Sequence, residues 1–244
     1  MQEMIQVERL KKTYGGLTAV DDLSFSVGPG TVFGLLGANG AGKSTTIECI
    51  LGTRRADSGR VSVLGMDPRR DRKELFQRVG VQFQETSFQD QIAVGELCQV
   101  TASLYRRAAD PVDLLERFGI ADKGKSLVKD LSGGQRQRLC IVLALIPVPE
   151  AVFLDELTTG LDAKARREVW KILSGLKEKG LTILLSSHFM DEVEALCDRI
   201  CILKQGRAVF QGTVAEAVAA SPHDRFEDAY LWFTDEEGDA DEDL

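Results

Sequence analysis

The strongest constraint on the fold of this 244-residue chain is a glycine-rich segment between an apolar run and a helix-compatible stretch. The run 32–36 precedes Gly37-Ala-Asn-Gly-Ala-Gly-Lys-Ser-Thr45, and residues 46–51 favour a helix. A strand-to-helix turn of this kind directs backbone N–H groups and the positive end of a helix dipole at an anion. Its glycines let the backbone approach phosphate oxygens closely. The segment therefore predicts a phosphate-binding loop.

Polar residues of this loop have expected tasks in binding a nucleoside triphosphate. The Lys43 ammonium can reach the β- and γ-phosphates, and the Ser44 hydroxyl can ligate the accompanying Mg²⁺. The expected nucleotide contacts within the loop are Gly37, Asn39, Gly40, Gly42, Lys43, Ser44 and Thr45.

A second segment has the pattern of an anion-binding helix start. Leu131-Ser-Gly-Gly-Gln135 leads into residues 136–145, which begin polar and continue apolar. This order predicts a helix with Ser132 at its N-cap. An ordinary capped helix is the alternative reading of the pentapeptide alone.

Two acids end a third segment, the short apolar run Ala151-Val-Phe-Leu-Asp155-Glu156. The run predicts a buried central strand, and ligands of open α/β sheets bind at such strand ends. Asp155 is expected to hold Mg²⁺, and Glu156 to orient and polarise the attacking water. The alternative is a purely structural capped turn over residues 155–162.

Together these segments resemble the nucleotide-binding subunits of ATP-binding cassette (ABC) transporters over roughly residues 3–215. The resemblance implies an α/β fold: a phosphate-loop NTPase core with a mostly parallel sheet, an antiparallel β layer and a helical lobe. It implies a single ATPase domain over 1–234. Its parts are a core lobe of about 1–84 and 150–215, a helical lobe of about 85–149, and a C-terminal helical extension, 216–234.

The resemblance also assigns site residues. It implies ATP and Mg²⁺ as ligands, with Lys43, Gln84, Glu156 and His188 as the catalytic set. Mg²⁺ would contact Ser44, Gln84 and Asp155, although Gln82 competes with Gln84 for its position. Tyr14 matches the aromatic platform for adenine, with a structural tyrosine as the alternative.

Partners follow from the same resemblance. ATP would lie between this chain and a second copy or a homologous cassette, which contributes Ser132, Gly133, Gly134, Gln135 and Asp162. Closure and reopening would act on a membrane-spanning subunit through a groove near residues 84–105. We expect its exposed apolar contacts to be Phe88, Ile92, Val94 and Leu97.

Composition agrees with a cytoplasmic protein held peripherally at the inner face of the membrane by its membrane subunit. No apolar stretch approaches the ~18–20 residues of a membrane span, and the N-terminus lacks the pattern of a signal peptide. Five scattered cysteines suit a reducing compartment. Seven of the 38 acids lie in 235–244, a tail expected to be disordered, and the other 31 nearly balance 30 Lys and Arg. We therefore expect no nucleic-acid partner.

Further segments favour ATPase subunits of bacterial exporters whose membrane subunits are separate chains, among them residues 158–162 and His188-Phe-Met-Asp-Glu-Val-Glu194. An importer ATPase is the nearest alternative. A soluble ABC protein acting on DNA or ribosomes and a non-catalytic nucleotide sensor are the others. The chain departs from the family pattern at Ala38 and Leu157, where prolines are usual.

Overall fold

The computed structural model describes residues 3–83, 88–89, 91–156 and 158–234. Its main sheet has the strand order β5-β6-β7-β3-β8-β9. The strands are β3 (Val32–Leu36), β5 (Val79–Gln82), β6 (Ala151–Asp155), β7 (Thr182–Ser187), β8 (Arg199–Lys204) and β9 (Arg207–Gly212). All neighbours are parallel except β9, which is antiparallel to β8. Every residue of β3, β6 and β7 is buried, which explains why hydrophobic residues do not alternate with exposed polar ones along these strands.

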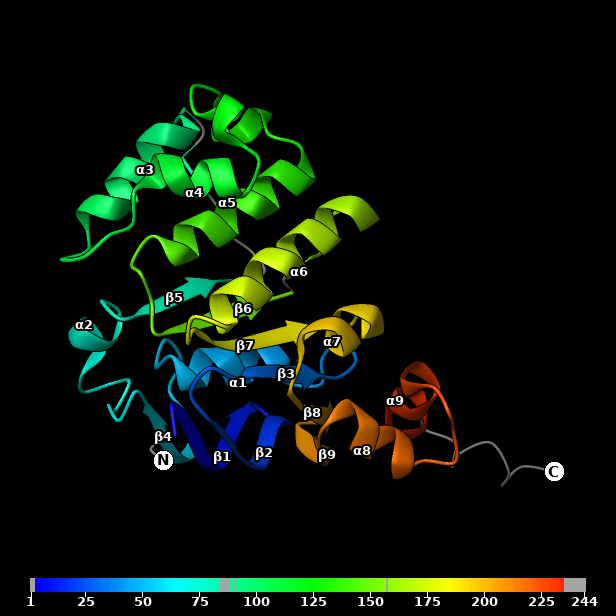
Figure 1. Ribbon diagram of the computed structural model, residues 1–244. Helices are drawn as coiled ribbons and strands as arrows, with labels where there is room; N and C mark the ends of the chain where they lie inside the picture. Colours follow the sequence, from blue (N-terminus) through cyan, green and yellow to red (C-terminus); the bar gives the residue numbers. More distant parts are fainter. Residues whose placement is uncertain (1–2, 84–87, 90, 157, 235–244) are drawn as a thin grey trace.

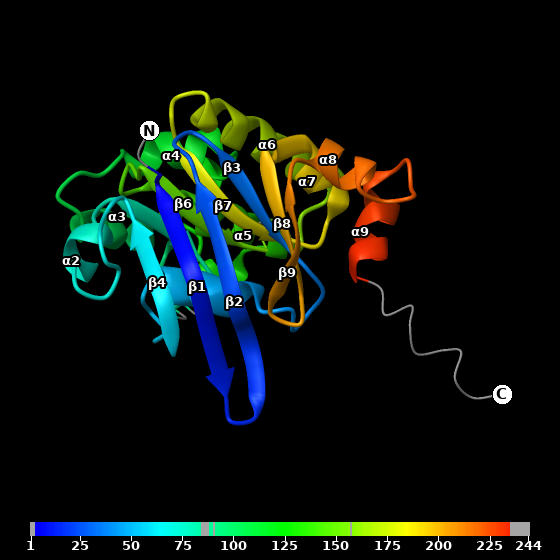
Figure 2. The same cartoon turned by 90° about the horizontal axis from the view of Figure 1, so that it is seen from below.

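A second, antiparallel sheet lies below the main one in Figure 1. In it β1 (Ile5–Tyr14) lies between β2 (Leu17–Val27) and β4 (Ser58–Val63) and pairs with both, as Figure 2 shows from below. The two inward side chains Ile5 and Val7 alternate with exposed polar ones, as expected of a sheet with one solvated face. The Phe25 ring of β2 stacks on the Phe33 ring of β3 with centroids 4.9 Å apart. The two sheets therefore share one apolar core, and α1 (Lys43–Ile50) belongs to it.

The remaining helices follow the sheet strands or gather above them. Figure 1 shows α3 (Val94–Ser103), α4 (Pro111–Arg117) and α5 (Gly133–Leu145) together, away from the antiparallel sheet. Two 3₁₀ turns, Ala121–Lys123 and Val128–Asp130, lie between α4 and α5. The others are α2 (Arg72–Leu75), α6 (Ala163–Lys177), α7 (Met190–Leu196), α8 (Val214–Ala219) and α9 (Phe226–Thr234). The expected sheet layers and helices are present, while the lobe boundaries near 84 and 149 stay predictions.

One expectation about exposed apolar side chains is wrong. Val94 is fully buried, with 0% exposure, because it begins α3 on the side that packs into the core. Phe88, Ile92 and Leu97 are partly buried against the same core. Among the described residues of 84–105, the large apolar side chains that are exposed are Val100 and Leu104, at 54% and 68%.

In the part of the chain that the structure describes, no helix is long and apolar enough to cross a membrane.

Candidate nucleotide site

The phosphate loop joins β3 to α1 through glycines with positive φ. Gly37, Gly40 and Gly42 have φ angles of 150°, 82° and 101°. At Gly42 a Cβ atom would lie 2.2 Å from the carbonyl oxygen of Ala19, so both the backbone angle and the available space require glycine. Helix α1 then begins at Lys43, three residues earlier than the expected helical stretch 46–51.

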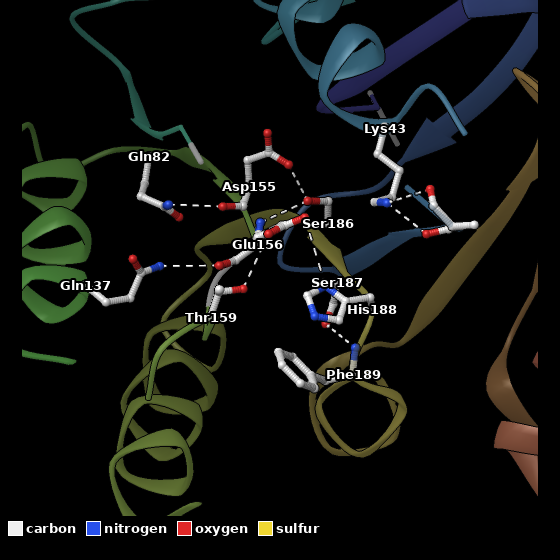
Figure 3. A network of polar contacts seen from close by, with 12 residues as sticks. Lys43, Gln82, Gln137, Asp155, Glu156, Thr159, Ser186, Ser187, His188 and Phe189 are labelled. Carbon is white, nitrogen blue, oxygen red and sulfur yellow. Dashed lines mark hydrogen bonds and ion pairs between the residues drawn. The ribbon is translucent and has the colours of Figure 1, made fainter. Parts of the chain in front are cut away.

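Lys43 folds back over this loop. Its ammonium donates hydrogen bonds to the carbonyl oxygens of Gly37 (2.8 Å) and Ala38 (3.1 Å), and the residue is only 6% exposed (Figure 3). Burial lowers the pKa of Lys43, whereas the carboxylates of Glu156 and Asp155 act in the opposite direction. The loop thus holds a desolvated cation facing two acids, an arrangement suited to a polyphosphate.

Asp155 and Glu156 stand at the carboxyl end of β6, and both are bound to Ser186 of the neighbouring strand β7. The Ser186 hydroxyl donates to the Asp155 carboxylate and accepts from the backbone N–H of Glu156 at 3.0 Å. Asp155 is 2% exposed. Glu156 has a φ of +53°, an uncommon backbone conformation for a residue other than glycine. Such strained conformations concentrate at functional sites.

The Glu156 side chain points toward His188, which follows β7 (Figure 3). Glu156 Oε1 lies 4.0 Å from His188 Nδ1, and their side chains are 10% and 41% exposed. Thr159 Oγ1 donates to Glu156 Oε2 at 3.4 Å. The structure therefore brings Lys43, Asp155, Glu156 and His188 to one edge of the parallel sheet, where the carboxyl ends of β3, β6 and β7 lie side by side.

Gln137 is a site residue that the sequence interpretation missed. It lies in α5, and its Nε2 donates to the carbonyl oxygen of Glu156 at 3.3 Å. Its position three residues after Gly134 places it on the same helix face. Gly134 itself packs near Leu161, as a Cβ there would meet Leu161 at 3.3 Å. A polar residue one turn into the helix was the available signal.

The pentapeptide begins α5 as predicted. Ser132 Oγ accepts from the Gln135 N–H at 3.3 Å, and Gln135 Oε1 accepts from the Ser132 N–H at 3.0 Å. This reciprocal pair is a capping box. Asp162 caps α6 in a related way, because its carboxylate accepts from the Ala165 N–H at 2.8 Å. Gly133 and Gly134 lie in the first turn of α5, directly after the Ser132 cap.

The last two predicted site residues are Gln84 and Tyr14. Gln84 lies outside the residues that the structure describes. Its competitor Gln82 is 4% exposed, and its Nε2 donates at 3.0 Å to the carbonyl oxygens of Asp155 and Phe83, so it joins the ends of β5 and β6. Tyr14 ends β1 on the other sheet and is 38% exposed. The Lys12 ammonium and the Arg54 guanidinium lie 5.2 and 5.3 Å from its ring centroid.

Within the described ranges, no group of three or more His, Cys, Asp and Glu side chains could hold a metal ion. Ser44 and Thr45 are partly buried in the first turn of α1, and Asn39 and Gly40 are exposed at the loop tip.

A phosphate loop, a second capped glycine helix start and paired acids at a strand end define a phosphate-loop ATPase. The family model described as "ABC transporter" matches residues 20–159, and the chain belongs to the ABC transporter family. It is 39% identical over 223 residues to a Nod factor export ATP-binding protein I of Paraburkholderia xenovorans (strain LB400), covering 88% of this chain and 73% of that protein.

Two further comparisons agree. The daunorubicin resistance ATP-binding protein DrrA3 of Streptomyces coeruleorubidus is 38% identical over 230 residues, 91% of this chain and 72% of that protein. A solved structure of the ATP binding subunit of an ABC transporter has a TM-score of 0.87 at 26% identity, covering 95% of this chain and all of that one. The predicted family and fold class are thus confirmed, and this chain is the ATP-binding, ATP-hydrolysing subunit of an ABC transporter.

Proposed function

We propose that this ATPase pairs with a second cassette around ATP and drives export through a separate membrane subunit. The observation that carries the hydrolytic part is the cluster of Lys43, Asp155, Glu156 and His188 at one sheet edge. Export is supported by the relatives, whose names are those of a Nod factor export protein and a daunorubicin resistance protein. An importer ATPase is the less favoured alternative.

Hydrolysis follows from this arrangement. The loop N–H groups and Lys43 hold the β- and γ-phosphates. Glu156 accepts a proton from water as its oxygen attacks the γ-phosphorus, and the bond to the β–γ bridging oxygen breaks to release ADP and phosphate. His188 contacts the γ-phosphate from the end of the neighbouring strand β7. The Thr159 hydroxyl and Gln137 support Glu156 from the side chain and backbone respectively.

Mg²⁺ enters this proposal as part of the substrate MgATP. In nucleotide sites Mg²⁺ keeps several waters and takes one or two carboxylates in addition to phosphate oxygens. Buried Asp155 fits that pattern, with the Ser44 hydroxyl at the start of α1 and Gln84 as further ligands. The ion would neutralise charge that develops on the phosphates.

A second copy or a homologous cassette completes the site. Its Ser132 to Gln135 and Asp162 would face the ATP bound here, and Tyr14 would stack on adenine. The exposed Val100 of α3 and Leu104 at its C-terminal end, in place of buried Val94, would contact the membrane-spanning subunit. That contact would hold the chain at the cytoplasmic face of the membrane, and no nucleic acid takes part.

The experiment that tests this function is Glu156→Gln, which keeps the side chain's shape and removes the base. ATP turnover should fall by ~100-fold or more with ATP binding retained. Because the γ-phosphate then persists, an ATP-dependent dimer should appear in size-exclusion chromatography. Glu178→Gln, at an exposed position after α6, is the matched control. Unchanged turnover in Glu156→Gln would refute the assignment of Glu156 as the catalytic base. Export and import are distinguished by identifying the membrane protein that copurifies with the chain.

A further inference from the structure

The residue after His188 connects this histidine to α6. The His188 and Phe189 rings have centroids 4.2 Å apart, inclined by 37°, and Figure 3 shows the two side by side. The Arg166 guanidinium of α6 lies 4.3 Å from the centroid of the Phe189 ring. Imidazole, phenyl ring and guanidinium therefore form one contiguous group from the nucleotide site to α6.

Arg166 is held firmly in this group. Its side chain is 18% exposed, and Nη1 donates to the Asp191 carboxylate of α7 at 3.1 and 3.3 Å. The Asp191 side chain is 61% exposed, so the ion pair contributes little to stability. Its effect is geometric, because a planar guanidinium can pair with a carboxylate and cover an aromatic ring at once.

A second contact fixes the same two helices. Trp170, four residues after Arg166 and so on the same face of α6, donates from Nε1 to Glu192 Oε1 at 3.1 Å. Glu192 has 0% exposure, and Ser187 and Thr158 lie near its carboxylate, while Glu192 Oε2 and Thr158 Oγ1 have no hydrogen-bond partner among the described residues. The segments on both sides of the site, after Glu156 and before His188, thus meet at one buried carboxyl group.

The loop of His188 is also held from within. Ser187 Oγ accepts from the Phe189 N–H at 3.0 Å. The loop between β7 and α7 is thereby attached through the Phe189 backbone on one side and the Phe189 ring on the other. A histidine that is 41% exposed would otherwise have several accessible rotamers.

We propose that Arg166 and Phe189 are positioning residues, which hold the His188 imidazole 4.0 Å from Glu156 and tie its placement to α6, the helix that Asp162 caps. This inference rests on the proposed contact of His188 with the γ-phosphate. Arg166 and Phe189 do not themselves touch the nucleotide. They restrict the imidazole to the orientation that reaches it.

The test measures ATP turnover, affinity for a fluorescent ATP analogue and melting temperature of the purified chain. Arg166→Ala should lower kcat by about 10- to 100-fold, since small misplacements of catalytic groups cost that much. KM and analogue affinity should change less than about twofold. Arg166→Lys keeps the charge but loses the planar contact, so it should show most of the loss. Arg167→Ala, at an exposed position on the same helix, is the control.

The deciding measurement is a double-mutant cycle with His188→Ala. If Arg166 acts through His188, Arg166→Ala should cause less than about a twofold further loss in that background. Multiplicative losses, or wild-type turnover of Arg166→Ala, would overturn the inference and leave the proposed function intact. Wild-type turnover of His188→Ala would instead overturn the role of His188 and this inference with it.

A fold defect is separated from a positioning defect by conservative variants at the ring. Phe189→Tyr keeps the ring and should retain nearly the kcat of the wild type, whereas Phe189→Leu removes the ring and should lower kcat as Arg166→Ala does. If Arg166→Ala lowers the melting temperature by many degrees, Arg166→Lys and Phe189→Leu are each combined with His188→Ala in the same double-mutant cycle. The further loss of turnover in those pairs then decides whether the defect acts through His188. Equal kcat for Phe189→Leu and Phe189→Tyr contradicts the proposal.

Discussion

Two alanine substitutions in the phosphate loop separate backbone strain from steric conflict. Gly40 and Gly42 both have positive φ, 82° and 101°, so alanine is strained at either position. A Cβ at Gly40 would meet nothing within 4 Å, whereas at Gly42 it would lie 2.2 Å from the Ala19 carbonyl oxygen. The pair therefore differs mainly in whether there is room for one methyl group.

The structure sets the expected magnitudes. Alanine in a left-handed conformation costs roughly 1–2 kcal/mol, which applies to both variants. Forcing a methyl group into filled space adds about 1–3 kcal/mol at Gly42 alone. For a chain of this size 1 kcal/mol corresponds to ~2–4 °C in melting temperature. We therefore expect Gly42→Ala to melt about 2–12 °C below Gly40→Ala.

The assay is thermal unfolding of both variants and the wild type, followed by binding of a fluorescent ATP analogue. Gly42→Ala should also weaken nucleotide binding, because the backbone must shift where Lys43 begins α1. Equal melting temperatures for the two variants would refute the steric argument. The contact with Ala19 would then be relieved without cost, and the geometry of the β2–α1 approach would be wrong.

Two further predictions concern acids with shifted pKa values. Hydrogen bonds from Thr13 and Lys12 lower the pKa of Asp57 to about 2, so its stabilisation is present above pH 3.8 and is lost as the pH falls through 2. Asp57→Asn should therefore melt lower than wild type at pH 7, and the gap should close between pH 3.8 and 2. A gap independent of pH contradicts this. Burial raises the pKa of Glu192, while Ser187, Thr158, Trp170 and Arg166 oppose the rise, so the wild type loses stability as the pH rises above 4.5. In urea unfolding, Glu192→Gln should gain stability relative to wild type from pH 4.5 to 7.5, and a constant difference would count against it.

The sequence alone determined the local elements of the site, because each depends on neighbours in the chain. Glycines with positive φ flank a strand whose five residues are all apolar, and the structure has that strand at the expected Val32–Leu36. Strand β6 ends at Asp155, as the apolar run 151–154 before it predicts. The Ser132 cap also needs only residues three positions away, so it was readable from the pentapeptide.

The orientation of α3 was decided by tertiary packing. Apolar periodicity indicates that a helix has a buried face, but residues near its ends cannot be assigned to that face without the partner helices. Val94 therefore proved buried, whereas Val100 and Leu104 are exposed.

Contacts between distant segments were likewise beyond the sequence. Ser186 joins the two acids from 30 and 31 residues away, and Arg166 of α6 reaches Phe189 at the start of α7. Motif spacing names the residues that follow β6 and β7, but it does not state which side chains share one space. That depends on the parallel pairing of these strands, which aligns Asp155 with Ser186 and so sets His188 beside Glu156. The order in which strands pair depends on how distant segments together bury both faces of the sheet. No local sequence pattern therefore encodes it.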